Sequence, residues 1–291
     1  MIYIQLLGGL GNQLFVWAGA HKLNEMFSEP VCILNIIDKN LRDDRPNELN
    51  GLVQHCIHEI NLRDTRVFSL FFRTIDRFEL EKNSLFRSIL QRLGVYTFEN
   101  PIEPIEFLKG KPRIVRCYFQ RNEYVDSIWG QISTEILEVF NQTTIPEINR
   151  LYTSQVVHFR RGDTVNFYST HGVLSIDYFL RNLSPNLETL VSTDDLSYTD
   201  FIEKEFKTRL ILTPLDTSTW QSLKIFCGAK EFIGSNSTLS WWAAKIRSKS
   251  HKNSSILPRP WTVSGTNYEN GLNIPEVKFV SAQFEGQVKI G

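Results

Sequence analysis

Hydrophobic and polar positions follow a regular rhythm in the second half of the chain. From residue 156 onward, short apolar runs alternate with segments whose apolar residues recur every three or four positions. Short apolar runs predict buried strands, and the wider spacing predicts helices. This alternation is typical of an α/β domain with a doubly wound parallel sheet. The expected strands are 156–161, 188–192, 210–212 and 230–233, and the expected helices are 175–183, 197–206, 216–227 and 239–247, opening at Ser175, Ser197, Asp216 and Leu239.

The first half begins with a strand, a glycine turn and a helix. Residues 2–7 alternate enough to predict a strand, and residues 12–27 carry apolar side chains at helical spacing. The polar residues 143–149 are the expected linker between an α/β domain of residues 1–150 and a second one of residues 151–291. The remaining expected elements are a strand at 31–37, loops at 38–60, one or two helices at 63–93, a strand at 113–119 and a helix at 122–140 with Asn122 as its N-cap.

Length and composition set the broad class. A chain of 291 residues suggests two domains, with one large domain as the alternative, and 42% hydrophobic residues can bury a sizeable core. The 32 basic and 32 acidic residues cancel, which excludes a general nucleic-acid surface. Any anion site must therefore be local.

Cysteine and membrane signals are weak. The four cysteines contain no CxxC pair, which favours buried thiols in a reducing compartment, and His55-Cys56-Ile57-His58-Glu59 is not an HExxH motif. No apolar run approaches the ~18 residues of a membrane helix, and no signal peptide opens the chain. We therefore expect no metal site and a cytoplasmic protein. The basic stretch 245–252 is interpreted as a solvated face, with peripheral attraction to an anionic membrane as the alternative.

The first glycine turn resembles a nucleotide-binding loop only in part. Gly9 and Gly11 fit the dinucleotide fingerprint, but position 14 is Leu and the acidic residue expected ~20 positions later would have to be Glu29, just before a proline. The glycines still indicate that the backbone approaches a ligand or a partner element closely.

The stretch 156–163 places two arginines at the end of a predicted buried strand. Strand periodicity would point His158 and Arg160 to one side, and Phe159 and Arg161 to the other. Guanidiniums at the end of a buried strand are costly unless an anion meets them. A structural pair of Arg161 with Asp163, with Arg160 merely solvated, is the alternative.

Three expected strand ends carry polar residues, and parallel strands bring their carboxyl ends to one edge where ligands bind. They are His158 and Arg160 on the first strand, Asp194 and Asp195 on the second, and Ser235-Asn236-Ser237-Thr238 on the last. The last group opens a helix, whose free N–H groups attract anions. The aspartates suit a ribose or a guanine edge, although both groups could also be ordinary helix caps. Together they indicate a nucleotide-diphosphate site facing the glycine loop.

At these residues the chain resembles the α-1,2-fucosyltransferases. The resemblance runs in order from residue 1 to about 261, and it departs at Thr164 and Tyr198, where the family often has aromatic residues and Trp. The stretches that carry it are Gly8-Gly-Leu-Gly-Asn-Gln-Leu-Phe15, Tyr118-Phe-Gln120 with Tyr124, His158-Phe-Arg-Arg-Gly-Asp163, His171-Gly-Val-Leu174 with Asp177-Tyr178, Ser192-Thr-Asp-Asp195, Ser235-Asn-Ser-Thr-Leu-Ser-Trp-Trp-Ala-Ala244 and Pro260-Trp261.

The resemblance implies a GT-B architecture of two Rossmann-like domains with a cleft between them. It implies transfer of L-fucose from GDP-fucose to the 2-hydroxyl of a terminal β-galactoside, with inversion and without a metal or other cofactor. The N-terminal domain would take the glycan acceptor, and surface-glycan biosynthesis would be the context. Arg160 and Asn12 are the expected catalytic residues, while Gly9, Gly11 and Gln13 would form the cleft loop. The expected donor-binding residues are His158, Arg161, Asp163, Asp194, Ser235, Asn236, Ser237 and Thr238, with Arg161 and Asp163 holding the loop.

Other functions remain open at this stage. An α-1,6- or protein O-fucosyltransferase would share the HxRRxD-like stretch. An oxidoreductase would use the first glycine loop, and a carbohydrate-binding protein without activity would leave both strand-end arginines unexplained. No motif singles out a general base.

Overall fold

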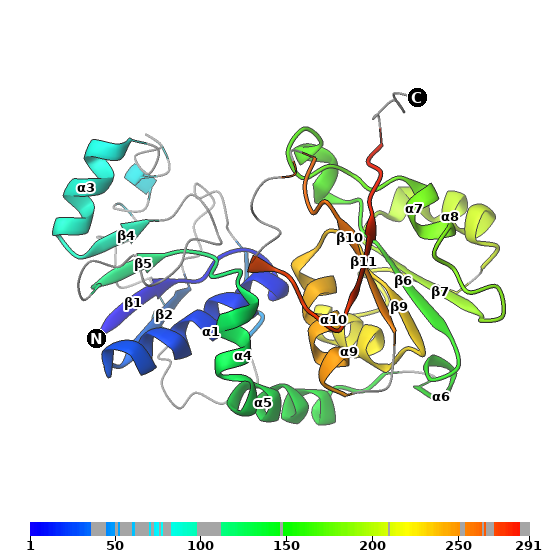
Figure 1. Ribbon diagram of the computed structural model, residues 1–291, viewed down its shortest axis with the longest axis horizontal. Helices are drawn as coiled ribbons and strands as arrows, with labels where there is room; N and C mark the ends of the chain where they lie inside the picture. Colours follow the sequence, from blue (N-terminus) through cyan, green and yellow to red (C-terminus); the bar gives the residue numbers. More distant parts are fainter. Residues whose placement is uncertain are drawn as a thin grey trace. The chain divides into compact units, whose positions relative to one another are not determined.

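The computed structural model describes residues 1–35, 45–49, 52, 60–61, 70, 73–75, 77, 83–97, 112–145, 148–208, 210–250, 254–263, 265 and 271–285 (Figure 1). Its contacts divide the chain into two compact units, residues 1–139 and 140–291. The division falls within helix α5 (Trp129–Gln142), earlier in the chain than the predicted boundary after residue 150. Each unit holds its own parallel sheet.

The N-terminal unit is built on a five-stranded sheet in the order β3-β2-β1-β5-β4. All of its strand pairs are parallel. Helix α1 packs along β2 and α4, and its buried residues include Leu14, Phe15 and Leu23 of the expected apolar spacing. The elements are β1 (Ile2–Gln5), α1 (Leu10–Phe27), β2 (Val31–Asn35), β3 (Ile60–Asn61), α3 (Ser84–Arg92), β4 (Val95–Thr97), β5 (Ile114–Arg116), α4 (Asn122–Ser127) and α5.

The C-terminal unit is built on a six-stranded sheet in the order β11-β10-β9-β6-β7-β8, also parallel in every pair. The α/β class with parallel sheets in both halves is thereby confirmed. The elements are α6 (Ile148–Leu151), β6 (Gln155–Phe159), η4 (Asp163–Phe167), α7 (Ile176–Leu180), β7 (Thr189–Thr193), η5 (Leu196–Tyr198), α8 (Thr199–Phe206), β8 (Ile211–Leu212), α9 (Thr219–Gly228), β9 (Glu231–Ile233), α10 (Thr238–Lys249), β10 (Ser255–Arg259) and β11 (Lys278–Ser281).

The strand order identifies where a ligand can enter the C-terminal sheet. From β6 the chain moves outward through β7 to β8, then returns to the other side of β6 with β9 and continues through β10 to β11. This is the order 3-2-1-4-5-6 of dinucleotide-binding sheets, and the direction reverses between β6 and β9. A crevice forms at the carboxyl ends of the two strands at such a reversal, because their crossover helices leave on opposite faces.

Alternating side chains of β6 face different helix layers, as predicted. His158 packs on Phe226 of α9, whereas Phe159 packs on Phe179 of α7 and Phe206 of α8. Figure 1 shows α9 and α10 on one side of this sheet and α7 and α8 on the other. The two faces of the strand end thus meet different surroundings.

Several predicted helix starts are wrong. The helix expected at 122–140 is two helices, since α4 ends at Ser127 and α5 begins at Trp129, and the N-cap position of α4 is Arg121 rather than Asn122. Helix α9 begins after a capping box of Ser218 and Gln221, and Asp216 instead accepts hydrogen bonds from Thr213 in the preceding turn.

The other two predicted starts have different outcomes. Ser175 is the N-cap residue of α7, as predicted, but its side chain makes no capping bond and the helix ends at Leu180 instead of residue 183. Ser197 does not open α8; Asp195 caps the 3-10 turn before it by accepting from the Ser197 N–H. Neighbouring candidates compete for these positions, and packing decides between them.

Two basic residues of the stretch 245–252 do not lie on a solvated face. Lys245 is fully buried and Arg247 is 1% exposed, so the predicted solvated face and its membrane alternative are both wrong for these two residues. Trp241 and Trp242 in the same helix are fully buried. Lys249 in the same last turn is exposed.

The described residues also bear on the thiol and membrane predictions. Cys32, Cys117 and Cys227 are free thiols, and burial raises the pKa of Cys32 to about 11. No helix among the described residues is long and apolar enough to cross a membrane. The stretch 55–59, with Cys56, lies outside the described residues, as do most of the loops at 38–60 and much of 63–93.

Candidate functional site

His158 joins the end of β6 to the start of α10. Its ring Nδ1 lies 2.7 Å from the Ser240 hydroxyl and 3.4 Å from that of Ser235, and the side chain is buried. Burial, followed by the charge of Arg160, lowers the pKa of His158 to about 3. The ring is therefore neutral at physiological pH.

A neutral buried histidine makes the fold acid-sensitive. The pKa of the ring is 6.5 in the unfolded chain and about 3 in the folded chain. The contribution of His158 to the free energy of unfolding is therefore fully present above pH 6.5 and is lost as the pH falls toward 3. Below pH 6 we expect the free energy of unfolding to fall by up to about 1.4 kcal/mol per pH unit from this residue. Urea unfolding between pH 7 and 5 measures the slope.

The matched variant is His158→Gln, which keeps a hydrogen-bonding amide beside Ser240. This variant should remove the contribution of His158 to the dependence of the free energy of unfolding on pH. His21, whose pKa burial lowers to about 4, retains its own share, so the variant slope should be reduced but not zero. An unchanged slope in His158→Gln would contradict the assignment.

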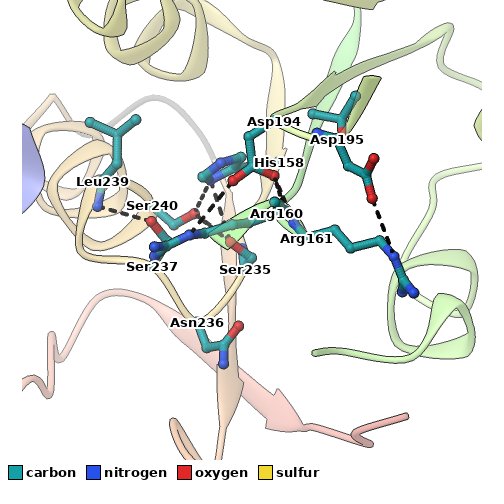
Figure 2. Close-up of polar contacts among 12 residues, drawn as sticks. His158, Arg160, Arg161, Asp194, Asp195, Ser235, Asn236, Ser237, Leu239 and Ser240 are labelled. Atoms are coloured by element: carbon teal, nitrogen blue, oxygen red, sulfur yellow. Dashed lines mark hydrogen bonds and ion pairs between the residues drawn. The ribbon is translucent and has the colours of Figure 1, made fainter. Parts of the chain in front are cut away.

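Arg160 and Asp194 lie beside each other after strands β6 and β7 (Figure 2). Asp194 Oδ1 accepts hydrogen bonds from the backbone N–H groups of Arg161 (2.7 Å) and Gly162 (2.8 Å). Its other oxygen, Oδ2, lies 4.0 Å from Nε of Arg160. Asp194 therefore holds the turn that follows β6. The sequence predicted it only as a donor-binding residue.

Gly162 is required by this close approach. A Cβ at position 162 would lie 2.8 Å from Oδ2 of Asp194, closer than such atoms can come without a shift. Asp163 begins η4 directly after it. The expected part of Asp163 in holding the loop stays a prediction.

Arg161 is held by three side chains on the face opposite His158. Its Nη1 donates to Oε1 of Glu285 at 2.5 Å, and its Nε lies 3.4 Å from Oδ2 of Asp195. The guanidinium lies over the Tyr198 ring at 4.1 Å, and that ring also stacks on Phe159. Arg161 thus points to the side of Phe159, as strand periodicity predicted.

The electrostatics of Arg161 follow from these neighbours. Burial by itself lowers the pKa of Arg161, but the hydrogen bond and charge of Glu285, followed by Tyr198 and Asp195, raise it above the ordinary value. The guanidinium is thus charged and already matched by carboxylates. It is not placed as an open anion receptor.

The start of α10 forms the third side of the site. Ser237 caps the helix by accepting from the Leu239 N–H at 3.3 Å, and Ser235 is fully buried with its N–H donating to the Ser240 hydroxyl. Thr238 is the first residue of the helix. Asn236 points away from His158 (Figure 2) and donates to the carbonyls of His171 and Gly172. Capping uses only one of the free N–H groups at this helix start, so it does not exclude the predicted anion site, which stays a prediction.

The glycine loop of the N-terminal unit is organised by Gln13. Its amide donates to the carbonyls of Gly8 and Pro46, and its oxygen accepts from the Glu48 N–H. Asn12 accepts from Gln120 at 3.0 Å. Gly8 has a φ of +68°, and a Cβ there would lie 2.4 Å from Nδ2 of Asn12, so glycine is needed. The loop follows the carboxyl end of β1 and leads into α1. The hydrogen bond between Asn12 and Gln120 connects it to the segment after β5, which is the neighbour of β1 in this sheet.

Glu48 occupies the start of α1. Its Oε2 accepts from the Leu10 N–H at 2.6 Å and would lie 3.5 Å from a Cβ on Gly9. Gly9 is the N-cap residue, and Gly11 is buried inside the helix. A carboxylate here takes the place that a pyrophosphate takes in dinucleotide-binding loops.

Glu48 and Glu285 were not predicted from the sequence, because nothing near them in the chain marks them as partners of the two loops. Tyr198 differs from the family pattern only in residue type, and its contact with Arg161 was not predicted either. Among the described residues, no group of three or more His, Cys, Asp or Glu could hold a metal ion.

Comparisons with known proteins add a functional context. No family model matches the chain. The chain is 25% identical to "O-antigen biosynthesis glycosyltransferase WbnK" of Escherichia coli, over 89% of this chain and 94% of that protein. It is 23% identical to "Alpha-1,2-colitosyltransferase" of Escherichia coli, over 90% of this chain and 92% of that protein. The chain is thus similar to glycosyltransferases over nearly its whole length.

Among solved structures, POFUT1 in complex with GDP-fucose aligns with a TM-score of 0.48 at 12% identity, covering 88% of this chain and 97% of that one. The NodZ α-1,6-fucosyltransferase crystallised with GDP aligns with a TM-score of 0.44 at 12% identity, covering 83% of this chain and 91% of that one.

Proposed function

We propose that this protein is a glycosyltransferase that transfers L-fucose from GDP-fucose to the 2-hydroxyl of a terminal β-galactoside, with inversion and without a metal. The two glycosyltransferase relatives support the reaction class. The name of one relative contains an α-1,2 linkage, which agrees with the linkage that the motifs of this chain suggest.

One observation carries the donor half of the proposal. The strand order of the C-terminal sheet reverses between β6 and β9, and Arg160 and Ser235 follow the carboxyl ends of those two strands. A nucleotide diphosphate at this reversal would meet a guanidinium on one side and the start of α10 on the other. Both favour negative charge.

The chemistry assigns a role to each group. As the acceptor oxygen bonds to the anomeric carbon, the bond from that carbon to the β-phosphate oxygen breaks and its electron pair leaves with GDP. The hydroxyl proton passes to a base. Negative charge therefore grows on the β-phosphate, where Arg160 and the N–H group of Thr238 at the start of α10 stabilise it. This supplies the leaving-group assistance that a metal gives in other transferases.

Asp194 and His158 support the donor site in different ways. Asp194 holds the turn that carries Arg160, and His158 holds the Ser235 segment against β6. The contacts of the nucleoside itself are proposed to involve both residues, as the family resemblance implies.

The acceptor half of the proposal concerns the N-terminal unit. Gln5 and Thr97 end strands β1 and β4, and Oε1 of Gln5 and Oγ1 of Thr97 are buried without a hydrogen-bond partner among the described residues. Buried polar atoms are rarely left unpaired unless a ligand or water meets them. Together with Asn12 they make this strand edge the proposed place for a polyhydroxylated acceptor.

Two alternatives meet specific observations. A colitose donor in place of fucose is the second candidate, because one relative is a colitosyltransferase by name. An oxidoreductase using the first glycine loop is disfavoured, because Glu48 already occupies the start of α1 and would repel a pyrophosphate.

A thermal shift series tests the donor. GDP should stabilise the chain by about 2.7 kcal/mol at a hundred times its dissociation constant, whereas UDP and NADH should not. Transfer from GDP-fucose and from GDP-linked colitose to a β-galactoside, followed by linkage analysis, then tests the sugar and the position. Stabilisation by NADH alone would overturn the proposal, and a 1,6-linked product would overturn the linkage.

A further inference from the structure

The segment after β11 returns to the edge of the donor site. Its backbone runs beside the end of β10 and the loop before α7, because the Ala282 N–H donates to the Arg259 carbonyl and the Glu285 N–H to that of Val173. Phe284 forms an isolated antiparallel bridge with Leu174 and is 3% exposed. These contacts fix residues 282–285 against the sheet.

This anchoring places Glu285 on the donor turn. Its carboxylate receives the Nη1 hydrogen bond of Arg161 at 2.5 Å, and the side chains of Arg161 and Glu285 are 17% and 27% exposed. A charge-assisted hydrogen bond at such partial burial is screened less than an exposed pair. It therefore restrains the direction of Arg161.

The turn 160–162 is then held from two sides. Asp194 binds the backbone N–H groups of Arg161 and Gly162, while Glu285, Asp195 and Tyr198 hold the Arg161 side chain. Arg160 directly precedes the anchored residues Arg161 and Gly162 and directly follows β6. Its backbone has little freedom while both anchors hold.

We propose that Glu285 is a positioning residue for sugar transfer: through Arg161 it fixes the turn that presents Arg160 to the diphosphate. This inference rests on the proposed function. It extends the site beyond residue 261, where the family resemblance ends, to the far end of the described chain. Glu285 itself touches no reacting atom.

Glu285→Gln tests the inference, because it removes the charge and keeps the shape. We expect kcat for transfer from GDP-fucose to fall roughly 10-fold, since displacing a catalytic group by a fraction of an ångström is costly. The KM for GDP-fucose should change much less. Glu285→Asp keeps the carboxylate and should recover part of the loss. The matched control is Glu276→Gln on the same segment, where Glu276 is exposed, and it should behave like wild type.

A double-mutant cycle separates positioning from a general loss of stability. If Glu285 acts through Arg161, Glu285→Gln should cost little further activity in an Arg161→Gln background. Full additivity of the two losses would overturn the inference, and so would wild-type kcat in Glu285→Gln.

Hydrogen exchange separates this inference from the proposed function. In Glu285→Gln, the amides of Arg161 and Gly162 should exchange faster than in wild type or Glu276→Gln, whatever the substrate is. Unchanged exchange rates would show that Glu285 does not restrain the turn 160–162 and would overturn the inference. A wild-type chain that neither binds GDP nor transfers fucose would instead overturn the proposed function.

Discussion

Arg160→Ala is expected to lower the rate of fucosyl transfer roughly 10- to 100-fold, because it removes a charge-assisted hydrogen bond of about 1.5–3 kcal/mol to the leaving phosphate. The effect should appear in kcat and in kcat/KM alike, since the charge it meets grows in the transition state. Steady-state kinetics with GDP-fucose measures it. The transfer rate of Arg160→Lys should lie between those of wild type and Arg160→Ala, because lysine keeps the charge but not the planar guanidinium.

The matched control is Arg150→Ala. Arg150 pairs with Glu188 at the opposite, amino-terminal edge of the same sheet, so its loss should leave the rate unchanged. Circular dichroism and the melting temperature check that both variants fold. Near wild-type turnover by a folded Arg160→Ala would show that another group clamps the phosphate.

Arg247→Leu is expected to destabilise the C-terminal unit by about 3–5 kcal/mol, the cost of breaking a buried hydrogen-bonded charge network. The five N–H groups of the Arg247 guanidinium lie within hydrogen-bond distance of six acceptors, and the residue is 1% exposed. Burial lowers the pKa of Arg247 to about 10, which still leaves it charged at neutral pH. The acceptors are the carbonyls of Phe226, Cys227, Ala229, Lys230 and Ser254 and the hydroxyl of Ser255.

These acceptors explain the size of the effect. Most of them are carbonyls at or just beyond the carboxyl end of α9, which would otherwise lack partners inside the protein. Leucine fills the space and satisfies none of them. Urea unfolding measures the change. Lys249→Leu, in the exposed part of the same helical turn, is the control and should stay within about 0.5 kcal/mol of wild type. Equal stability of the two variants would show that water replaces the guanidinium.

Strand and helix alternation was predictable because it depends on local spacing. The strands 156–161, 188–192 and 230–233 correspond to β6, β7 and β9, with ends shifted by at most two residues. The helix starts were not predictable to the same degree. Asp216 and Ser218 are both acceptable caps of α9 by residue type, and only the folded structure shows that Ser218 is the N-cap residue.

The candidate site divides in the same way. That His158 and Phe159 face opposite sides follows from strand geometry alone, and the contacts confirm it. Asp194 could be recognised as a polar strand end. Its hydrogen bonds to the turn at Gly162 could not, because they join residues 32 and 33 positions apart.

Long-range partners account for the rest. Glu285 meets Arg161 across 124 residues, and Arg247 lies in a stretch whose composition indicates a solvated surface. Neither pairing has a local signature, because the residues come together only after the sheet has formed.

Three features could be predicted from the sequence alone. They are the alternation of strands and helices, the polar residues at the strand ends and the resemblance to fucosyltransferases. Only the tertiary structure shows which partners the buried charges have. Arg161 is paired with Glu285 and Asp195, and Arg247 donates hydrogen bonds to backbone carbonyls. The physical reason is that spacing acts between near neighbours in the chain. The balance of a buried charge depends on every group that the fold brings within a few ångströms of it.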